Sequence, residues 1–127
     1  SFFWWSINCT CNDGDMAKLS TEQQIFTQNI SQLILKANSL GINLTFGEAF
    51  RTEYQQREYL RTGKSKTMNS NHLKRLAVDF NFFINGRLVW EHPLITELGE
   101  YWESINEKNR WGGNFSFKDT PHFERNI

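Results

Sequence analysis

The stretch that most constrains the fold of this 127-residue chain lies near its middle, at residues 76–90. Residues 76–83 alternate apolar and polar side chains with the period of two that is typical of a half-buried β-strand. One face carries Leu76, Val78, Phe80 and Phe82, and the other carries Ala77, Asp79 and Asn81. Asn85-Gly86 is the preferred dipeptide of a two-residue hairpin turn, so residues 87–90 should pair back on this strand. The pattern predicts an antiparallel sheet, with Asp79 on the face turned away from the aliphatic core.

Three other segments have the pattern of helices. The first begins at Ser20-Thr21-Glu22-Gln23, which has the form of a capping box, and its apolar residues recur at helical spacing up to a stop at Gly41. The second is predicted over residues 52–62, before Gly63, and the third over residues 94–106. Strands are expected at residues 42–46, 111–117 and 121–125, and a loop at residues 64–71. Helices combined with a small antiparallel sheet predict an α+β fold.

Charge and hydropathy exclude several classes of protein. Fourteen basic and fourteen acidic residues cancel, so no overall field favours nucleic acid or an anionic membrane. No apolar run reaches the about 18 residues that a membrane-spanning helix needs. The length suits one domain, and we expect a monomer.

The first fifteen residues differ from the rest of the chain. The run Ser1-Phe2-Phe3-Trp4-Trp5 is strongly apolar, residues 12–15 are polar, and Met16 resembles a natural start. There is no basic region or small-residue cleavage site, so a signal peptide is not indicated. We expect residues 1–15 to be a leader outside a domain of residues 16–127. A remnant of a larger precursor and a strand docked on the domain are the alternatives. Cys9 and Cys11 are too close for an ordinary disulfide.

Chemistry-bearing residues gather in two stretches of the C-terminal half. Six residues separate His72 from Asp79, and His122 follows Asp119 by three positions. Two imidazoles and a carboxylate suit Zn²⁺, with Mn²⁺ or Co²⁺ as alternatives, and a catalytic zinc keeps a fourth position for water. From residue types alone, the plainer interpretation is a surface histidine, a strand carboxylate and a half-buried imidazole.

The order of the motifs resembles a known enzyme family. Ser70-x-His72-x6-Asp79, then Trp111-Gly112-Gly113, then Asp119-x-x-His122-Phe123-Glu124 is similar to the zinc D,D-peptidases. That family includes the vancomycin-resistance dipeptidases and carboxypeptidases and the phage L-alanyl-D-glutamate endolysins. Upstream, residues 47–52 with Gln55 resemble the family segment that carries an active-site arginine. Arg75 stands where the family usually has glycine, from which we expect an altered loop and not a lost metal.

The resemblance implies one zinc ion per chain and a general base beside it. The implied ligands are His72, Asp79 and His122. Asp119 matches the position of the family's catalytic carboxylate. Glu124 is the alternative base, although its place after the last ligand better suits a partner that orients that ligand. Arg51 would stabilise the oxyanion or bind a substrate carboxylate, because guanidinium groups suit such oxygens.

Substrate contacts are expected from Ser70, Gln55 and Trp111. Ser70 would hydrogen-bond the substrate backbone, and it is not a nucleophile because no histidine base is arranged for it. Trp111-Gly112-Gly113 would shape the cleft, with a tight turn around a core tryptophan as the alternative. His92 matches no family ligand and is expected at the surface.

The resemblance also implies a function and a place of action. It predicts a fold similar to that of the hedgehog signalling domain and an endolysin-like peptidase that cuts peptidoglycan stem peptides, with the L-Ala–D-Glu bond favoured. The protein would be phage-encoded or bacterial, made in the host cytoplasm and active on the cell wall. The alternatives are a D-Ala-D-Ala carboxypeptidase and a non-catalytic, zinc-containing domain for wall binding or signalling.

Overall fold

The α+β class predicted from the sequence is confirmed by a computed structural model, which describes residues 13–65 and 67–127. Short strands are interspersed with helices along the described chain. The elements are α2 (Asp13–Ser39), β1 (Ile42–Phe46), α3 (Glu53–Thr62), β2 (Ala77–Ile84), β3 (Arg87–Val89), α4 (Pro93–Ile105), β4 (Asn109–Trp111), the 3-10 helix η1 (Gly112–Asn114) and β5 (His122–Arg125).

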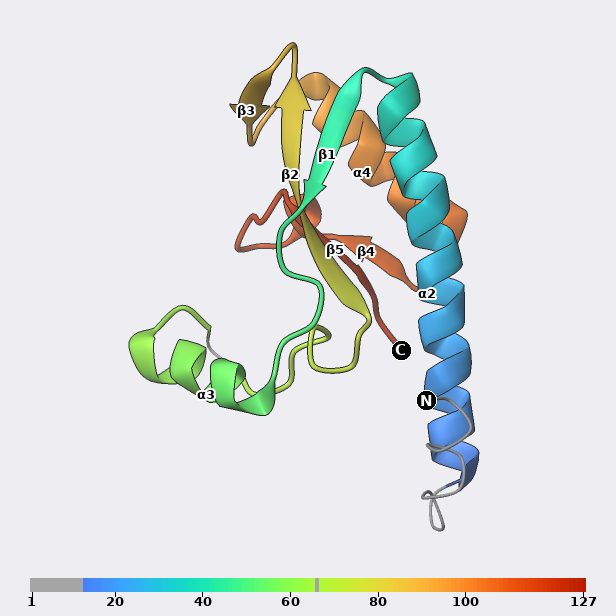
Figure 1. Cartoon of the computed structure of the whole chain (residues 1–127), viewed down its shortest axis with the longest axis vertical. Helices are drawn as coiled ribbons and strands as arrows, with labels where there is room; N and C mark the ends of the chain where they lie inside the picture. Colours follow the sequence, from blue (N-terminus) through green and yellow to red (C-terminus); the bar gives the residue numbers. More distant parts are fainter. Residues whose placement is uncertain (1–12, 66) are drawn as a thin grey trace.

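Strand β2 is the centre of an antiparallel sheet with the order β1-β2-β5-β4 (Figure 1). Its first part, residues 77–79, pairs with β5, and its second part, residues 80–84, pairs with β1. Strand β3 pairs with residues 82–84 of β2 through the hairpin expected at Asn85-Gly86. Both turn residues have positive φ, 53° and 78°, as this kind of turn requires.

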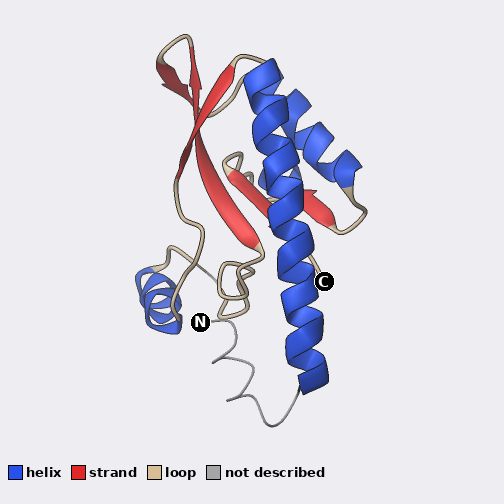
Figure 2. Cartoon of the chain, turned by 45° about the vertical axis from the view of Figure 1, so that its right-hand side comes forward, coloured by secondary structure: helices blue, strands red, loops and turns tan. Residues whose placement is uncertain are grey.

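Helices α2 and α4 lie together on one side of the sheet and cover its apolar face (Figure 2). The centre of this core is Trp102 of α4, whose ring meets Phe26 of α2 and Phe123 of β5 edge-on, with centroids 5.7 and 6.0 Å apart. Its indole nitrogen donates to the backbone oxygens of Arg110 and Glu124, each at 3.1 Å. The core therefore fixes β4 and β5 against α4.

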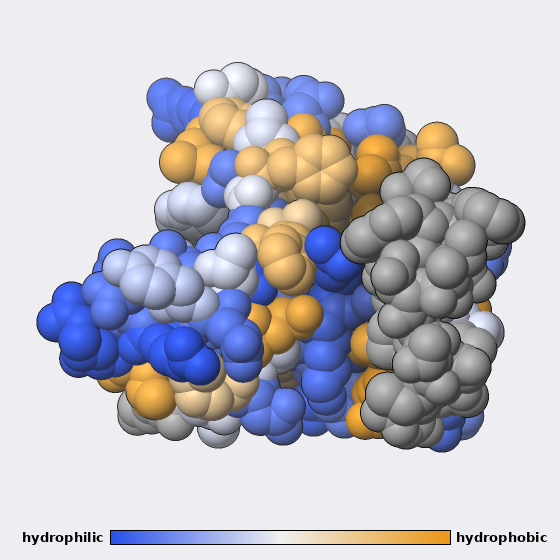
Figure 3. All heavy atoms as spheres, turned by 60° about the horizontal axis from the view of Figure 1, so that its bottom comes forward, coloured by the Kyte–Doolittle hydropathy of each residue, from blue (hydrophilic) through white to orange (hydrophobic). Residues whose placement is uncertain are grey.

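Helix α3 stands apart from this two-layer body (Figure 1). It begins after Thr52, whose hydroxyl accepts from Gln55 N, and ends at Gly63 with φ 82°. The lobe that α3 forms is mostly hydrophilic on its outer surface, at the left of Figure 3. Two connecting segments join it to the sheet, and both carry candidate site residues.

Two predicted boundaries are wrong. The capping box at Ser20 does not start a helix, because α2 already begins at Asp13, and Gln23 Nε2 instead donates to Lys74 O at 2.8 Å. The extended segment expected at residues 111–117 is interrupted by η1 directly after Trp111. Gly112 O accepts from both Phe115 N and Asp119 N, which curls the chain back on itself.

The division at residue 15 stays a prediction. A boundary between residues 15 and 16 falls inside α2, while residues 1–12, with both cysteines, lie outside the described residues. In the part of the chain that the structure describes, no helix combines the length and apolarity needed to cross a membrane.

Candidate metal centre

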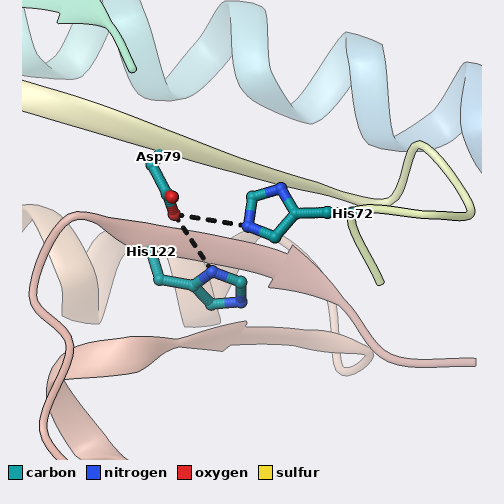
Figure 4. A group of neighbouring side chains, drawn as sticks. All are labelled: His72, Asp79 and His122. Atoms are coloured by element: carbon teal, nitrogen blue, oxygen red, sulfur yellow. Dashed lines mark hydrogen bonds and ion pairs between the residues drawn. The ribbon is translucent and has the colours of Figure 1, made fainter. Parts of the chain in front are cut away.

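Three potential metal ligands meet on the face of the sheet opposite α2 and α4. Asp79 projects from β2, and His122 of β5 is its partner in the antiparallel register. His72 comes from the turn that precedes β2, and Figure 4 shows all three side chains pointing toward one another. One ligand atom from each lies within 4.8 Å of the other two. The structure thus brings together all three residues that the sequence singled out.

Each imidazole turns one nitrogen toward Asp79 and the other toward an acceptor. His72 Nε2 lies 3.5 Å from Asp79 Oδ1, while His72 Nδ1 faces Ala49 O at 3.4 Å. His122 Nδ1 lies 3.1 Å from the same carboxylate oxygen, and His122 Nε2 lies 2.7 Å from Glu124 Oε1. An acceptor on the outer nitrogen fixes the tautomer whose inner nitrogen is free to bind a cation.

The charges of this cluster are strongly coupled. Burial opposes ionisation of Asp79, but hydrogen bonds with His122 and His72 outweigh it and hold the pKa of Asp79 well below its usual range. Burial opposes protonation of His122, yet bonds to Asp79 and Glu124 raise the pKa of His122 to about 9. Burial also opposes ionisation of Glu124, but its bond to His122 lowers the pKa of Glu124 to about 2. Two carboxylates therefore stay ionised around a site that attracts positive charge.

Asp119 lies in the turn that leads into β5. Its backbone is anchored at both ends, because Asp119 N donates to Gly112 O at 2.9 Å and His122 N donates to Asp119 O at 3.1 Å. The residue as a whole is exposed. Partial desolvation nevertheless raises the pKa of its carboxyl, with His122 opposing the rise and Asp79 adding to it. An accessible carboxyl with a raised pKa beside the triad is suited to proton transfer.

Arg51 is held in a polar cluster beside His72. Its guanidinium donates to Glu48 Oε1 at 2.6 Å, to Gln56 Oε1 at 2.6 Å and to Ser70 Oγ at 3.3 Å. Arg51 N also donates to His72 O at 3.3 Å, and Ser70 Oγ accepts from His72 N at 3.2 Å. Ser70 therefore joins the arginine to the loop that carries the first histidine.

Glu48 is a site residue to which the sequence interpretation gave no role. Its carboxylate pairs with Arg51 and accepts from Tyr59 OH at 3.2 Å, and it lies 3.9 Å from His72 Nδ1. Its backbone oxygen accepts from Asp79 N at 2.7 Å. The signal was its position three residues before Arg51, where a carboxylate can neutralise the arginine.

The glutamine that contacts Arg51 is Gln56 and not Gln55. Gln56 is fully buried and also donates to Thr67 O at 2.5 Å, whereas Gln55 is half-buried and bonds Thr52 Oγ1 through its backbone nitrogen. Adjacent helical residues point about 100° apart, so the choice depends on where the helix starts. The cap at Thr52 sets the start of α3. The substrate contact of Gln55 stays a prediction, and no contact of its side chain with the cluster supports it.

The substrate contact predicted for Trp111 is corrected. Its side chain is 3% exposed, and its indole nitrogen donates to Thr120 O at 2.7 Å. The ring packs on Gly99 and Gly113 so closely that a Cβ on either would come within 2.2 Å of it. A substrate cannot reach this ring. Trp111 instead supports the turn that carries Asp119. This agrees with the alternative interpretation of the sequence, a tight turn around a core tryptophan.

Arg75 occupies the turn between His72 and Asp79 with a positive φ of 56°. This is the left-handed region that favours glycine, the residue that the motif resemblance leads us to expect there. The guanidinium lies 4.3 Å from the centre of the Phe50 ring, a cation–π contact that partly offsets the strained backbone. The turn is retained without the glycine, and both flanking ligands stay in the cluster.

The protein is a small α+β domain with a His-Asp-His cluster on the sheet face opposite α2 and α4, the arrangement of a candidate metal centre. Comparison with known proteins indicates a family. Residues 63–125 match a peptidase family, M15, described as D-alanyl-D-alanine carboxypeptidase. The L-alanyl-D-glutamate peptidase of Listeria phage A118 is 32% identical over 93 residues, which cover 71% of this chain and 33% of the phage protein. The L-Ala D-Glu endopeptidase ChiX of Serratia marcescens is 29% identical and has a TM-score of 0.57, covering 66% of this chain and 67% of that one.

The family resemblance predicted from the motifs is thereby confirmed, and the chain is related to the M15 peptidases. The family match spans the segment from the end of α3 to β5 and so includes all three residues of the triad. The chain spans about a third of the length of the phage relative.

Proposed function

We propose that this domain is a zinc metallopeptidase that hydrolyses an amide bond in peptidoglycan stem peptides, with the L-Ala–D-Glu bond favoured. The observation that carries the proposal is the convergence of His72, Asp79 and His122 within 4.8 Å. The choice of bond is supported by the names of the phage and Serratia relatives. A role on the cell wall, for a phage-encoded or bacterial protein, follows from the same proposal.

The donor set fits zinc. His72 would bind through Nε2, His122 through Nδ1 and Asp79 through a carboxylate oxygen, because these atoms face one another while the outer nitrogens face acceptors. Two nitrogens and one oxygen match the three protein ligands of a catalytic zinc and leave a position for water. Glu124 behind His122 is the carboxylate partner that commonly orients a zinc-bound histidine.

The remaining residues divide the chemistry among them. Zinc, when bound, supplies an activated water and stabilises negative charge on the substrate. Asp119 accepts the proton of the attacking water and returns it to the leaving amine, as its accessible carboxyl of raised pKa allows. Arg51 is engaged by Glu48 and Gln56, so it acts through a fixed positive charge beside the developing oxyanion. Ser70, whose hydroxyl accepts from Arg51, is the group that we assign to hydrogen-bond the substrate backbone.

A D-Ala-D-Ala carboxypeptidase is the second candidate, because the matching family carries that description. It would use the same triad on a different bond. A non-catalytic zinc domain is a third possibility, and it is disfavoured by the presence of both Asp119 and Arg51 at the cluster.

Two measurements test the proposal. Mass spectrometry of muropeptides after digestion of purified peptidoglycan identifies the bond that is cut, and we expect new L-Ala ends on the glycan side. Elemental analysis should find one zinc per chain in the parent protein and a large loss in His122→Ala, with His92→Ala as a histidine control because His92 caps α4. Stoichiometric zinc in His122→Ala would refute the ligand assignment.

A further inference from the structure

A second polar feature lies beside the triad, and of its lining only Ser70 and Glu124 have a role in the chemistry proposed above. It is a pocket of about 310 Å³ between the loop of residues 67–74 and the ends of β4 and β5. Its walls are built almost wholly from polar side chains, among them Ser70, Asn71, Lys74, Arg110 and Glu124. We call it the Lys74 pocket.

The strand register places the Lys74 pocket next to the triad. Arg110 pairs with Glu124 across β4 and β5, and His122 lies two positions before Glu124 on the same strand. Residues two apart on a strand project from the same face and are separated by about 7 Å. The pocket wall is therefore one row of side chains from the proposed zinc position. Ser70 lines the pocket and also contacts Arg51, which joins the two regions on the loop side.

The charges in the Lys74 pocket suit an anion. The carboxylate of Glu124 already accepts from His122 and from Arg110, whose Nη2 donates at 2.8 Å. The Arg110 side chain stays about half exposed. Lys74 is half-buried, and its ammonium makes no hydrogen bond or ion pair with the described residues. Among the described side chains that line the pocket, two cations accompany one carboxylate, which is already engaged. A carboxylate on a ligand would balance the remaining positive charge.

We propose that the Lys74 pocket is a substrate subsite that binds a carboxylate of the stem peptide, with Lys74 as its principal cation. The proposal rests on the peptidase function proposed above and names a determinant of its specificity. A glutamate residue uses one carboxyl group in the chain and keeps the other free. A peptide residue spans at most about 3.5 Å, so a carboxylate within one or two residues of the scissile amide reaches a pocket about 7 Å away.

Kinetics with matched peptides test the subsite. The peptide L-Ala-γ-D-Glu-L-Lys-D-Ala would be compared with two forms, one amidated at the free carboxylate of D-Glu and one at the terminal carboxylate. We expect the parent protein to show a KM about tenfold higher for one amidated form, which identifies the bound carboxylate. In Lys74→Ala, KM for the acidic peptide should rise about tenfold. KM for the peptide amidated at the bound carboxylate should stay at the parent value, as should kcat and zinc content.

The control is Lys36→Ala, which removes the same charge from α2, where Lys36 lies against the Tyr101 ring. It should retain the parent preference. Equal KM values for the acidic and both amidated peptides in the parent, or an equal rise for all three in Lys74→Ala, would overturn the proposal.

A binding experiment separates failure of the subsite from failure of the peptidase function. Calorimetry would measure the binding of analogues with a reduced, uncleavable L-Ala–D-Glu bond. If the parent cleaves no peptide, a preference for the acidic analogue that is lost in Lys74→Ala still supports the subsite, and equal binding refutes it.

Discussion

A buried ion pair attaches the long helix α2 to the strand that carries His122, and its removal should destabilise the whole domain. Arg125 Nε donates to Glu22 Oε2 at 2.5 Å, and Lys108 Nζ donates to Glu22 Oε1 at 3.0 Å. The Glu22 and Arg125 side chains are 10% and 4% exposed. Arg125 Nη1 is already buried without a partner, so neutralising Glu22 leaves still more of this buried guanidinium without a charged acceptor.

The magnitude follows from this burial. Removing one partner of a buried ion pair commonly costs about 3–5 kcal/mol. Glu22→Gln should lower the free energy of unfolding by about 3 kcal/mol, because the amide oxygen can still accept one hydrogen bond. For a chain of this length that corresponds to a fall in Tm of about 10 °C. The matched control is Glu58→Gln, whose pair with Arg61 is exposed and should contribute less than about 1 kcal/mol.

The pH dependence carries a second test of the same pair. Hydrogen bonds from Arg125 and Lys108 lower the pKa of Glu22 from its usual 4.5. A carboxyl with a lowered folded-state pKa stabilises the protein above its unfolded pKa, and the effect is lost as pH falls through the folded pKa. Urea unfolding followed by tryptophan fluorescence should therefore show a gap between parent and Glu22→Gln that is full at pH 7 and narrows below about pH 4.5. A gap as small as that of Glu58→Gln, or one independent of pH, would refute this reasoning.

Substitutions at three further positions probe the site itself. Asp119→Ala should keep zinc and fold but lose on the order of 10²–10⁴ in turnover, and activity within a few-fold of the parent would assign the base elsewhere. Glu124→Gln removes the charged acceptor from His122 Nε2 and should weaken zinc binding about 10–100-fold in a chelator competition, whereas unchanged affinity would show that Glu124 does not orient the ligand. Arg75→Gly relieves the left-handed backbone while Arg75→Ala keeps the strain and loses the Phe50 contact, so the glycine variant should be more stable by about 1 kcal/mol in urea unfolding. Equal stability of the two variants would remove the argument from strain.

The sequence predicted those parts of the fold that depend on local pattern. The alternation at residues 76–83 located β2 to within a residue, and Asn85-Gly86 specified its hairpin, because both signals are complete within a few positions. The start of α2 was misplaced because Ser20 and Gln23 satisfy the capping pattern equally well inside a helix. The path after Trp111 depends on packing against Gly99, a residue distant in sequence, which local pattern cannot express.

The candidate ligands came from motif order and residue type, and the structure brings them together. What the sequence did not supply was the arrangement around them. The difference between Gln55 and Gln56 is one residue of helical phase, and it decides which side chain holds Arg51. Trp111 was assigned to the cleft because the glycines after it allow close backbone approach, but the same residues suit a tight turn with a core tryptophan. Only its depth in the fold distinguishes the two.

The backbone of Asp79 is clamped to the segment that carries Glu48 and Arg51. Gly47 N donates to Asp79 O and Asp79 N donates to Glu48 O, both at 2.7 Å. A Cβ on Gly47 would lie 3.1 Å from Asp79 O. Release of this segment would expose both amides and remove the arginine from the triad in the same event. Hydrogen exchange at the Gly47 and Asp79 amides should therefore report a single opening reaction. The free energy of this opening reaction sets how often the proposed metal site and the positive charge of Arg51 beside it are lost together.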